Sequence, residues 1–256
     1  MVKALQRLVF LYSIIKMTGK KNNPIMGFLF LVILSVFLMP YISSCGKGGQ
    51  ASSIASNTQL EVLNLSPDVE PVNLYIDYIL QNTTPFTYPY PSGYFYPKNL
   101  DTPLQIRSAA LATANLITID QNFQPNHKYT LFITGQYSGD STVTAILTED
   151  DSTATPNVGF GKIRYINLSI PNTPLDVIAN GTTVFPDALF EIPTAYKQVP
   201  VGNYIFQFVP TGTNSILTTT LPSTTIQDGR LYTLYSYGIV GRTDTSAFNA
   251  GVLINR

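Results

Sequence analysis

Residues 60–77, LEVLNLSPDVEPVNLYID, decide the fold because their pattern returns in residues 163–180, IRYINLSIPNTPLDVIAN. Both stretches place Asn-Leu-Ser ahead of a proline and a second apolar run. Asn64 matches Asn167, so the two copies are 103 residues apart. Alternating apolar and polar residues are typical of half-buried β-strands. The stretch therefore predicts strand, turn and strand, built twice.

A second match has the same offset. Tyr129-Thr130-Leu131 follows Phe-Gln in the first copy, and Tyr232-Thr233-Leu234 follows Ile-Gln in the second. Two matches at one offset predict duplicated domains of about 100 residues, the size of a β-sandwich domain. We expect a first domain over 59–152, a linker over 153–161 and a second domain over 162–256.

The fold class expected from these repeats is all-β, with two tandem immunoglobulin-like β-sandwich domains after a signal peptide and a flexible tether. No stretch past residue 50 shows sustained helical periodicity. Asn180-Gly181 predicts a two-residue hairpin turn. Tyr204, Phe206 and Phe208 alternate and should line one face of a strand. Strands are expected near 60–65, 72–77, 104–108, 115–119, 128–134, 142–148, 162–167, 175–179, 182–185, 203–209, 216–220, 231–238 and 250–255.

The charge balance argues against nucleic acid as a partner. Only 12% of the 256 residues are charged, against about 25% in an average soluble domain. Five of the 15 cations precede Cys45 and no acid does, so residues 45–256 carry ten cations against 15 anions. A body with a net charge of −5 lacks the basic patch that binds phosphates.

The N-terminal segment predicts export. Residues 27–38, GFLFLVILSVFL, form an apolar run too short to span a membrane, with lysines before it and small residues after it. Residues 1–44 are therefore expected to be a signal peptide, and Met17 is a more conventional start than Met1. A plain signal peptide or signal anchor with an incidental cysteine is the alternative.

Ile42-Ser43-Ser44-Cys45 resembles a bacterial lipobox, which implies that Cys45 becomes the lipid-modified first mature residue. Two or more acyl chains anchor a protein stably, so the membrane is an expected partner through the lipid on Cys45. The Gly/Ser-rich residues 46–58 predict a flexible tether. No Asp follows Cys45 directly, which favours the outer membrane, while the membrane face stays open.

The mature chain resembles the bacterial domain-of-unknown-function family 4397 as a tandem pair. The motifs that carry this resemblance are NLSPDVEPVNLYID, its partner NLSIPNTPLDVIANG, and residues 196–204, YKQVPVGNY. The first copy keeps Gly93-Tyr94 but lacks the Pro-x-Gly turn of the second. The resemblance covers roughly residues 60–256. It implies immunoglobulin-like sandwiches and brings no catalytic residues.

The ionisable residues are not expected to form a catalytic or metal-binding site. The only histidine, His127, is predicted to lie in a turn before a strand, and one histidine beside a lipidated cysteine argues against zinc. Glu149, Asp150 and Asp151 are read as a solvated linker, with a calcium site as the alternative. We expect no catalytic residue, metal or cofactor, although a hydrolase with an unrecognised carboxylate pair is formally open.

The candidate binding segment is residues 85–97, PFTYPYPSGYFYP, which the second copy lacks. Prolines stiffen a loop, and tyrosine offers an apolar face with a polar tip to a protein or a sugar ring. An envelope protein and a glycan are the two partners considered. The alternative is that the rings cover the edge of a sandwich or the contact between the domains. The aromatic residues concerned are Phe86, Tyr88, Tyr90, Tyr94, Phe95 and Tyr96.

Overall fold

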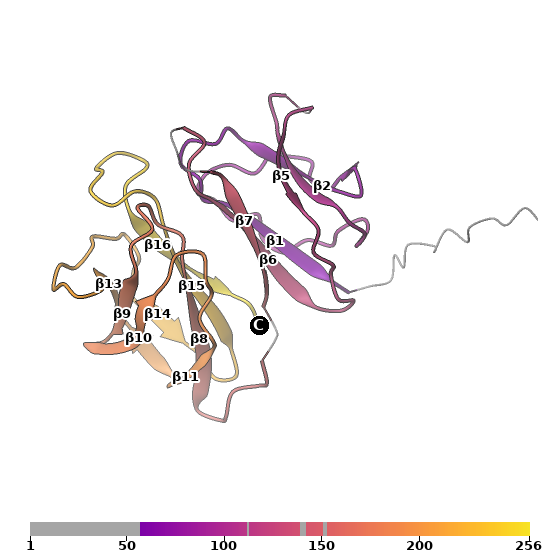
Figure 1. The fold of residues 1–256 in the computed structure, drawn as a ribbon. Helices are drawn as coiled ribbons and strands as arrows, with labels where there is room; N and C mark the ends of the chain where they lie inside the picture. Colours follow the sequence, from indigo (N-terminus) through magenta and orange to yellow (C-terminus); the bar gives the residue numbers. More distant parts are fainter. Residues whose placement is uncertain (1–56, 112, 139–141, 151–152) are drawn as a thin grey trace, which may run out of the picture. The chain divides into compact units, whose positions relative to one another are not determined.

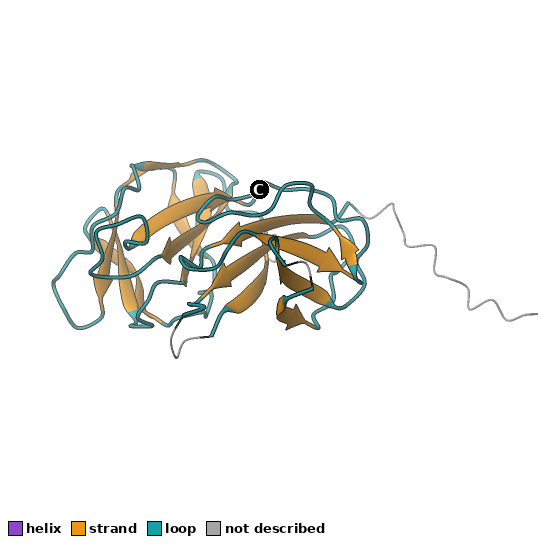
Figure 2. Ribbon diagram, turned by 90° about the horizontal axis from the view of Figure 1, so that it is seen from above, coloured by secondary structure: helices purple, strands orange, loops and turns teal. Residues whose placement is uncertain are grey.

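The computed structural model describes residues 57–111, 113–138, 142–150 and 153–256. The expected signal peptide, Cys45 and most of the tether lie outside these residues, as do Asp151 and residues 139–141. Within the described part of the chain every regular element is a strand and no helix occurs (Figures 1 and 2). The all-β prediction is confirmed.

The first half of the described chain is a sandwich of two sheets (Figure 1). One sheet has the order β1-β6-β7, formed by Gln59–Asn64, Lys128–Thr134 and Thr144–Glu149. The other has the order β3-β2-β4-β5, formed by Ile79–Leu80, Val72–Ile76, Leu104–Ser108 and Asn115–Ile119. Alternate residues of β2 are buried, as the period of two requires. Their apolar side chains meet those of β1 and β6 in one core.

The second half repeats this architecture. One sheet has the order β11-β8-β15-β16, formed by Lys197–Pro200, Phe160–Asn167, Leu231–Tyr237 and Asn249–Ile254. The facing sheet has the order β10-β9-β13, formed by Thr182–Ala188, Leu175–Ala179 and Phe206–Pro210. A short pair joins β12, Gly202–Tyr204, to β14, Thr224–Ile226. Strand β8 begins at Phe160, inside the segment expected to be linker.

The offset of 103 residues holds in three dimensions. In each half the first strand runs parallel to the strand that carries Tyr-Thr-Leu, β1 beside β6 and β8 beside β15. Each of these tyrosines also closes the loop before its strand. The backbone N–H of Gln124 donates to Tyr129 Oη at 2.8 Å, and that of Gln227 donates to Tyr232 Oη at 2.9 Å. The two halves are tandem copies of one immunoglobulin-like sandwich.

Local sequence signals place the hairpin and the core as expected. Asn180 and Gly181 both have positive φ, 48° and 84°, and join β9 to β10 with Ala179 opposite Thr182. Phe206 and Phe208 lie on β13 and are buried in the second core. Tyr204 packs against that core from the separate strand β12, since the strand expected over 203–209 is interrupted at Ile205.

The second half lacks one strand that the sequence predicted and has two that it did not predict. Residues 216–220 contribute only an isolated bridge between Leu217 and Phe208, at the open edge of β13. The short strands β11 and β14 were not expected. β11 ends in Pro200, which lowers the strand signal, and β14 has only three residues.

A third apolar cluster joins the two sandwiches. It contains Leu63, Leu65 and Phe132 from the first copy and Ile166, Leu168 and Tyr235 from the second, with Leu253 alongside. Each of the first three matches one of the second three at the offset of 103 residues. The same sheet face of each copy therefore packs against the other.

Candidate functional site

Two of the six predicted binding aromatics belong to the core of the first sandwich. Phe86 is buried, its backbone bridges Val72, and its ring stacks on Phe95 with centroids 6.3 Å apart. Phe95 forms a second bridge with Leu60, through two backbone hydrogen bonds of 2.9 Å. These two rings anchor the 85–97 segment to the sandwich, so they are not available to a ligand.

Two further aromatics of the segment face the second sandwich. Tyr88 is half-buried and lies edge-on to Tyr237 at 5.9 Å, and burial raises the pKa of its hydroxyl to about 12. Tyr94 Oη donates to Asp150 Oδ2 at 2.8 Å and accepts from Asn255 Nδ2 at 3.1 Å. Both tyrosines therefore form part of the contact between the copies, which was the alternative considered for them.

Tyr90 and Tyr96 remain in solvent, with 70% and 64% of their surface exposed. They lie towards opposite ends of β1. Tyr90 precedes Pro91, which bridges Leu63 near the end of β1, and Tyr96 follows Phe95, which bridges Leu60 at its beginning. Of the six predicted aromatics, only Tyr90 and Tyr96 are available to a ligand. The more buried aromatics of the same segment hold these two tyrosines at separate places.

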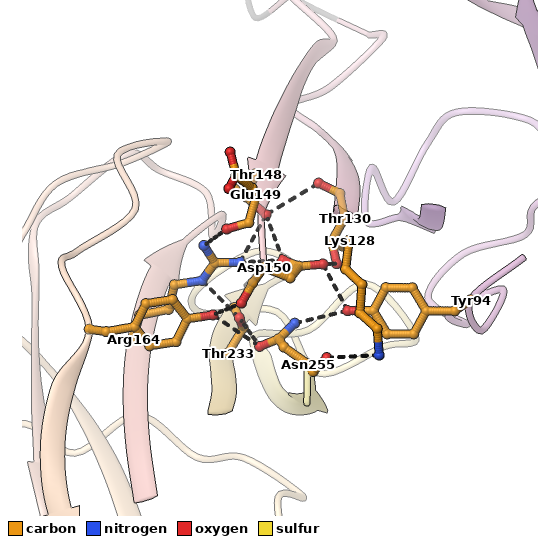
Figure 3. A network of polar contacts seen from close by, with 10 residues as sticks. Tyr94, Lys128, Thr130, Thr148, Glu149, Asp150, Arg164, Thr233 and Asn255 are labelled. Atoms are coloured by element: carbon orange, nitrogen blue, oxygen red, sulfur yellow. Dashed lines mark hydrogen bonds and ion pairs between the residues drawn. The ribbon is translucent and has the colours of Figure 1, made fainter. Parts of the chain in front are cut away.

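The most elaborate polar arrangement lies at the contact between the copies (Figure 3). The Asp150 carboxylate is fully buried, forms an ion pair with Arg164, and accepts from Thr130 Oγ1 at 2.7 Å. Thr148 Oγ1 is a further donor at 3.2 Å. Burial raises the pKa of Asp150, and the guanidinium and the hydroxyl donors oppose that rise. This carboxylate is saturated with donors and out of reach of solvent.

The reading of Glu149 and Asp150 as a solvated linker was wrong. Asp150 ends strand pairing by donating its N–H to the carbonyl of Lys128 at 2.7 Å, which turns its side chain into the contact. Glu149 Oε1 lies 2.9 Å from His127 Nδ1. Among the described residues no group of three or more His, Cys, Asp or Glu side chains is placed to hold a metal ion.

The second copy supplies counterparts of Asp150 and Thr130. The N–H of Asn255 donates to the carbonyl of Leu231 at 2.9 Å, as that of Asp150 does to Lys128, 103 residues earlier. Thr233 Oγ1 donates to Asn255 Oδ1 at 2.6 Å, matching Thr130 and Asp150. Asp150 and Asn255 are therefore equivalent positions.

Tyr196 is the counterpart of Tyr94. Lys197 pairs with Ile163 as Phe95 pairs with Leu60, which puts the two preceding tyrosines in equivalent places. Tyr196 Oη donates to the carbonyl of Asp150 at 2.8 Å, and its ring lies 4.8 Å from the Arg164 guanidinium. The network crosses from one copy to the other through paired residues.

Sequence reasoning missed this network, although one signal for it exists. Arg164 is the only charge in the apolar run Ile163–Asn167, and a charge on the buried face of a strand demands a partner. Asp150 directly follows β7, the strand that pairs with the Tyr-Thr-Leu strand β6. Its equivalence with Asn255 is visible only from strand pairing. The sequence offset differs by two residues there, so the repeat pattern concealed it.

A family model described as Domain of unknown function (DUF4397) matches residues 58–174 and again residues 161–250. The chain belongs to this family. The two matches correspond to the two sandwiches, so each sandwich is one DUF4397 copy. A search among curated proteins finds no match.

Membership in the DUF4397 family assigns no reaction and no ligand. The residues that recur between the two copies are the buried Asn64 and Asn167, the paired tyrosines and the polar contact, all of which hold the fold. In the described residues no helix has the length and apolarity that a membrane crossing needs. Functional residues are therefore to be sought where the copies differ, and the exposed Tyr90 and Tyr96 lie in such a segment.

Proposed function

We propose that this protein is a non-catalytic lipoprotein of the bacterial outer membrane, whose paired sandwiches serve as a binding or adhesion module at the cell envelope. The sequence supports the anchor through the lipobox at Cys45 and the Gly/Ser-rich residues that follow. The ligand is an envelope protein or a glycan. Nucleic acid does not fit the acidic body.

The observation that carries this proposal is the exposure of Tyr90. It lies between Pro89 and Pro91, and the segment is fixed on either side by the buried Phe86 and the half-buried Phe95. A tyrosine held in solvent by a stiff loop loses little conformational entropy when it binds a partner. Its place near the end of β1 also puts it away from the end where the chain enters the sandwich.

A glycan-binding role in a polysaccharide uptake system is the second candidate. Tyr90 lies close enough to Tyr237 to raise the pKa of that hydroxyl, after the larger effect of burial. The ring of Tyr90, 70% exposed, offers the kind of apolar face on which a sugar ring packs. A hydrolase with a carboxylate pair stays without a specific observation in its favour.

The test uses the mature chain, residues 45–256, against an array of host and microbial glycans and against solubilised envelope proteins. Tyr90→Ala should abolish the binding found with the wild type, because it removes an exposed ring without opening a core. Tyr137→Ala is the matched control, since Tyr137 is 68% exposed and lies outside the segment. Equal binding by both variants would refute the assignment of Tyr90. Mass spectrometry of the N-terminal peptide from native membranes tests the lipid on Cys45 separately.

A further inference from the structure

The first sandwich carries an apolar hairpin tip where the second carries a polar one. Asp77-Tyr78 joins β2 to Ile79-Leu80 of β3, and Asn180-Gly181 joins β9 to Thr182-Thr183 of β10, at the offset of 103 residues. Both turns have two consecutive residues of positive φ, 47° and 62° in the first and 48° and 84° in the second. The backbone is the same, and only the side chains differ.

Folding does not account for the residues of the first tip. Tyr78 occupies the left-handed conformation that disfavours every residue with a Cβ, at the position where the second copy has glycine. Its side chain buries little in return, because 63% of its surface is exposed. Ile79 and Leu80 are 47% and 37% exposed. A strained aromatic beside two exposed aliphatics indicates a contact made outside the fold.

The tip lies at the end of the sandwich where the chain enters. Leu60, the second residue of β1, exchanges backbone hydrogen bonds with Phe95. Three residues after Phe95, the backbone N–H of Lys98 donates to Gln81 Oε1 at 2.7 Å, and the Nζ–H of Lys98 donates to the carbonyl of Leu80. The exposed Tyr96 lies between these two attachments. We call Tyr78, Ile79, Leu80 and Tyr96 the hairpin patch.

The length of chain before β1 limits what can cover this patch. Eleven residues, 46–56, separate Cys45 from Asn57, the first described residue, whose N–H donates to Asn126 Oδ1. A Gly/Ser-rich segment of that length has a root-mean-square reach of about 20 Å. A lipid on Cys45 would therefore keep the entering end of the sandwich close to the bilayer surface at all times.

We propose that the hairpin patch rests on the phospholipid headgroup layer to which Cys45 is anchored; this rests on the proposed function above. Tyrosine is enriched at the membrane interface, where its ring lies among the headgroups and its hydroxyl stays hydrated, and Ile79 and Leu80 reach the acyl boundary. The contact is apolar and not electrostatic, because the mature chain has a net charge of −5 and Asp77 adjoins the patch.

Weak contacts between the hairpin patch and the membrane suffice to hold the patch there, because the lipid on Cys45 already keeps the chain at the same membrane. A short flexible linker gives an effective concentration in the millimolar range. Resting on the hairpin patch would fix the direction in which the sandwich leaves the membrane. Tyr90, near the other end of β1, would then face away from the bilayer and towards a ligand.

The absence of tryptophan from the chain allows a direct test. Tyr78→Trp gives a single reporter inside the patch, and Tyr137→Trp gives a matched reporter of similar exposure. Tyr137 donates its N–H to Asp68 in the loop that follows β1, at the other end of the sandwich. Each full-length variant is produced in a bacterium that processes lipoproteins and is reconstituted in zwitterionic phosphatidylcholine vesicles, with or without brominated acyl chains.

Bromine should reduce the emission of the Tyr78→Trp reporter by about twofold, because an indole at the interface lies near the acyl chains. The Tyr137→Trp emission should not change, and added salt should alter neither. Tyr96→Trp is the second reporter in the patch if the Tyr78 variant does not fold. Unquenched emission from both patch reporters, or equal quenching at Tyr137, would overturn the proposal. Blue-shifted but unquenched patch emission would also overturn it, by assigning the patch to a second copy of this chain.

Failure of the anchor is distinguished from failure of the contact. Flotation with vesicles and the mass of the Cys45 peptide report on the anchor. A chain that arrives with a free thiol is coupled through Cys45, its only cysteine, to a maleimide lipid, and the same quenching is then measured. As a final comparison, the tip Asp77–Leu80 is replaced with the second copy's Asn-Gly-Thr-Thr in the Tyr96→Trp chain. Quenching should fall in this folded variant, and unchanged quenching would count against the patch.

Discussion

Replacing Asp150 with asparagine should destabilise the paired sandwiches more than any other change of a single charged group. The substitution keeps the size of the side chain and removes its charge. Asp150 is fully buried, and Arg164, its partner, is only 5% exposed. The variant therefore leaves a guanidinium in the contact with three neutral acceptors: the carbonyl of Glu149, Thr148 Oγ1 and Thr233 Oγ1.

Removing one partner of a buried ion pair costs about 3–5 kcal/mol, because the remaining charge loses its compensation. The three neutral acceptors around Arg164 place the expected loss near the lower limit, at about 3 kcal/mol. Asp150→Asn with Arg164→Met should lose less than the sum of the two single variants, since the second change removes the stranded charge. For a chain of this size the single variant should melt about 10 °C lower.

Urea unfolding of residues 45–256, followed by circular dichroism at 25 °C, measures these differences. Asp244→Asn is the matched control, because the Arg242–Asp244 pair is about half exposed and its loss should not be measurable. If Asp150→Asn unfolds within about 1 kcal/mol of the wild type, or together with Asp244→Asn, the contact does not depend on the ion pair and our reasoning fails.

Three other predictions follow from buried groups. Burial, and then the nearby Asp150, raise the pKa of Glu61 to about 7 from an ordinary value of 4.5. Between these two values the folded chain keeps a proton that the unfolded chain has lost, so the free energy of unfolding should rise by up to about 3 kcal/mol as the pH falls from 8 to 5. Glu61→Gln should abolish this dependence on pH. Gly238→Ala should cost several kcal/mol more than Gly212→Ala in urea unfolding, because both have φ of +80° but only the first would place a Cβ 2.3 Å from a carbonyl oxygen. Tyr232→Phe should cost about 1–3 kcal/mol in the same assay by leaving the N–H of Gln227 without its acceptor.

The repeat and its strands could be predicted because they rest on local signals. Alternation in 72–77 and 175–179, and the Asn180-Gly181 turn, each determine a backbone conformation within a few residues. The offset of 103 residues then predicted two domains. The contact between them could not be predicted, since it depends on which sheet face of one copy meets which face of the other. Asp150 appeared solvated because it lies in an acidic cluster next to a linker.

The 85–97 segment shows the same limit. Its composition predicted a recognition surface, and composition cannot distinguish a ring that anchors a loop from one that the loop presents. Phe86 and Phe95 form bridges to strands of both sheets, and Tyr94 enters the polar contact. Only the pairing of the strands shows that these three rings hold the segment in place while Tyr90 is exposed to solvent. The hairpin tip at Tyr78 was missed for the opposite reason, because a strand ending in Asp-Tyr gives no turn signal comparable with Asn-Gly.

The charges at the contact explain why one copy pairs with the other and not with itself. Glu61 and Arg164 are equivalent positions at the offset of 103 residues, and Asp150 is equivalent to Asn255. Two first copies meeting through this face would set Glu61 against Asp150, two acids in a buried contact. Two second copies would leave Arg164 opposite Asn255, with no acid. Only the combination in the chain joins Arg164 to Asp150. Unfavourable alternatives of this kind give specificity beyond the strength of the favoured pair, so the duplicated faces select the pairing of a first copy with a second copy over the pairing of two like copies.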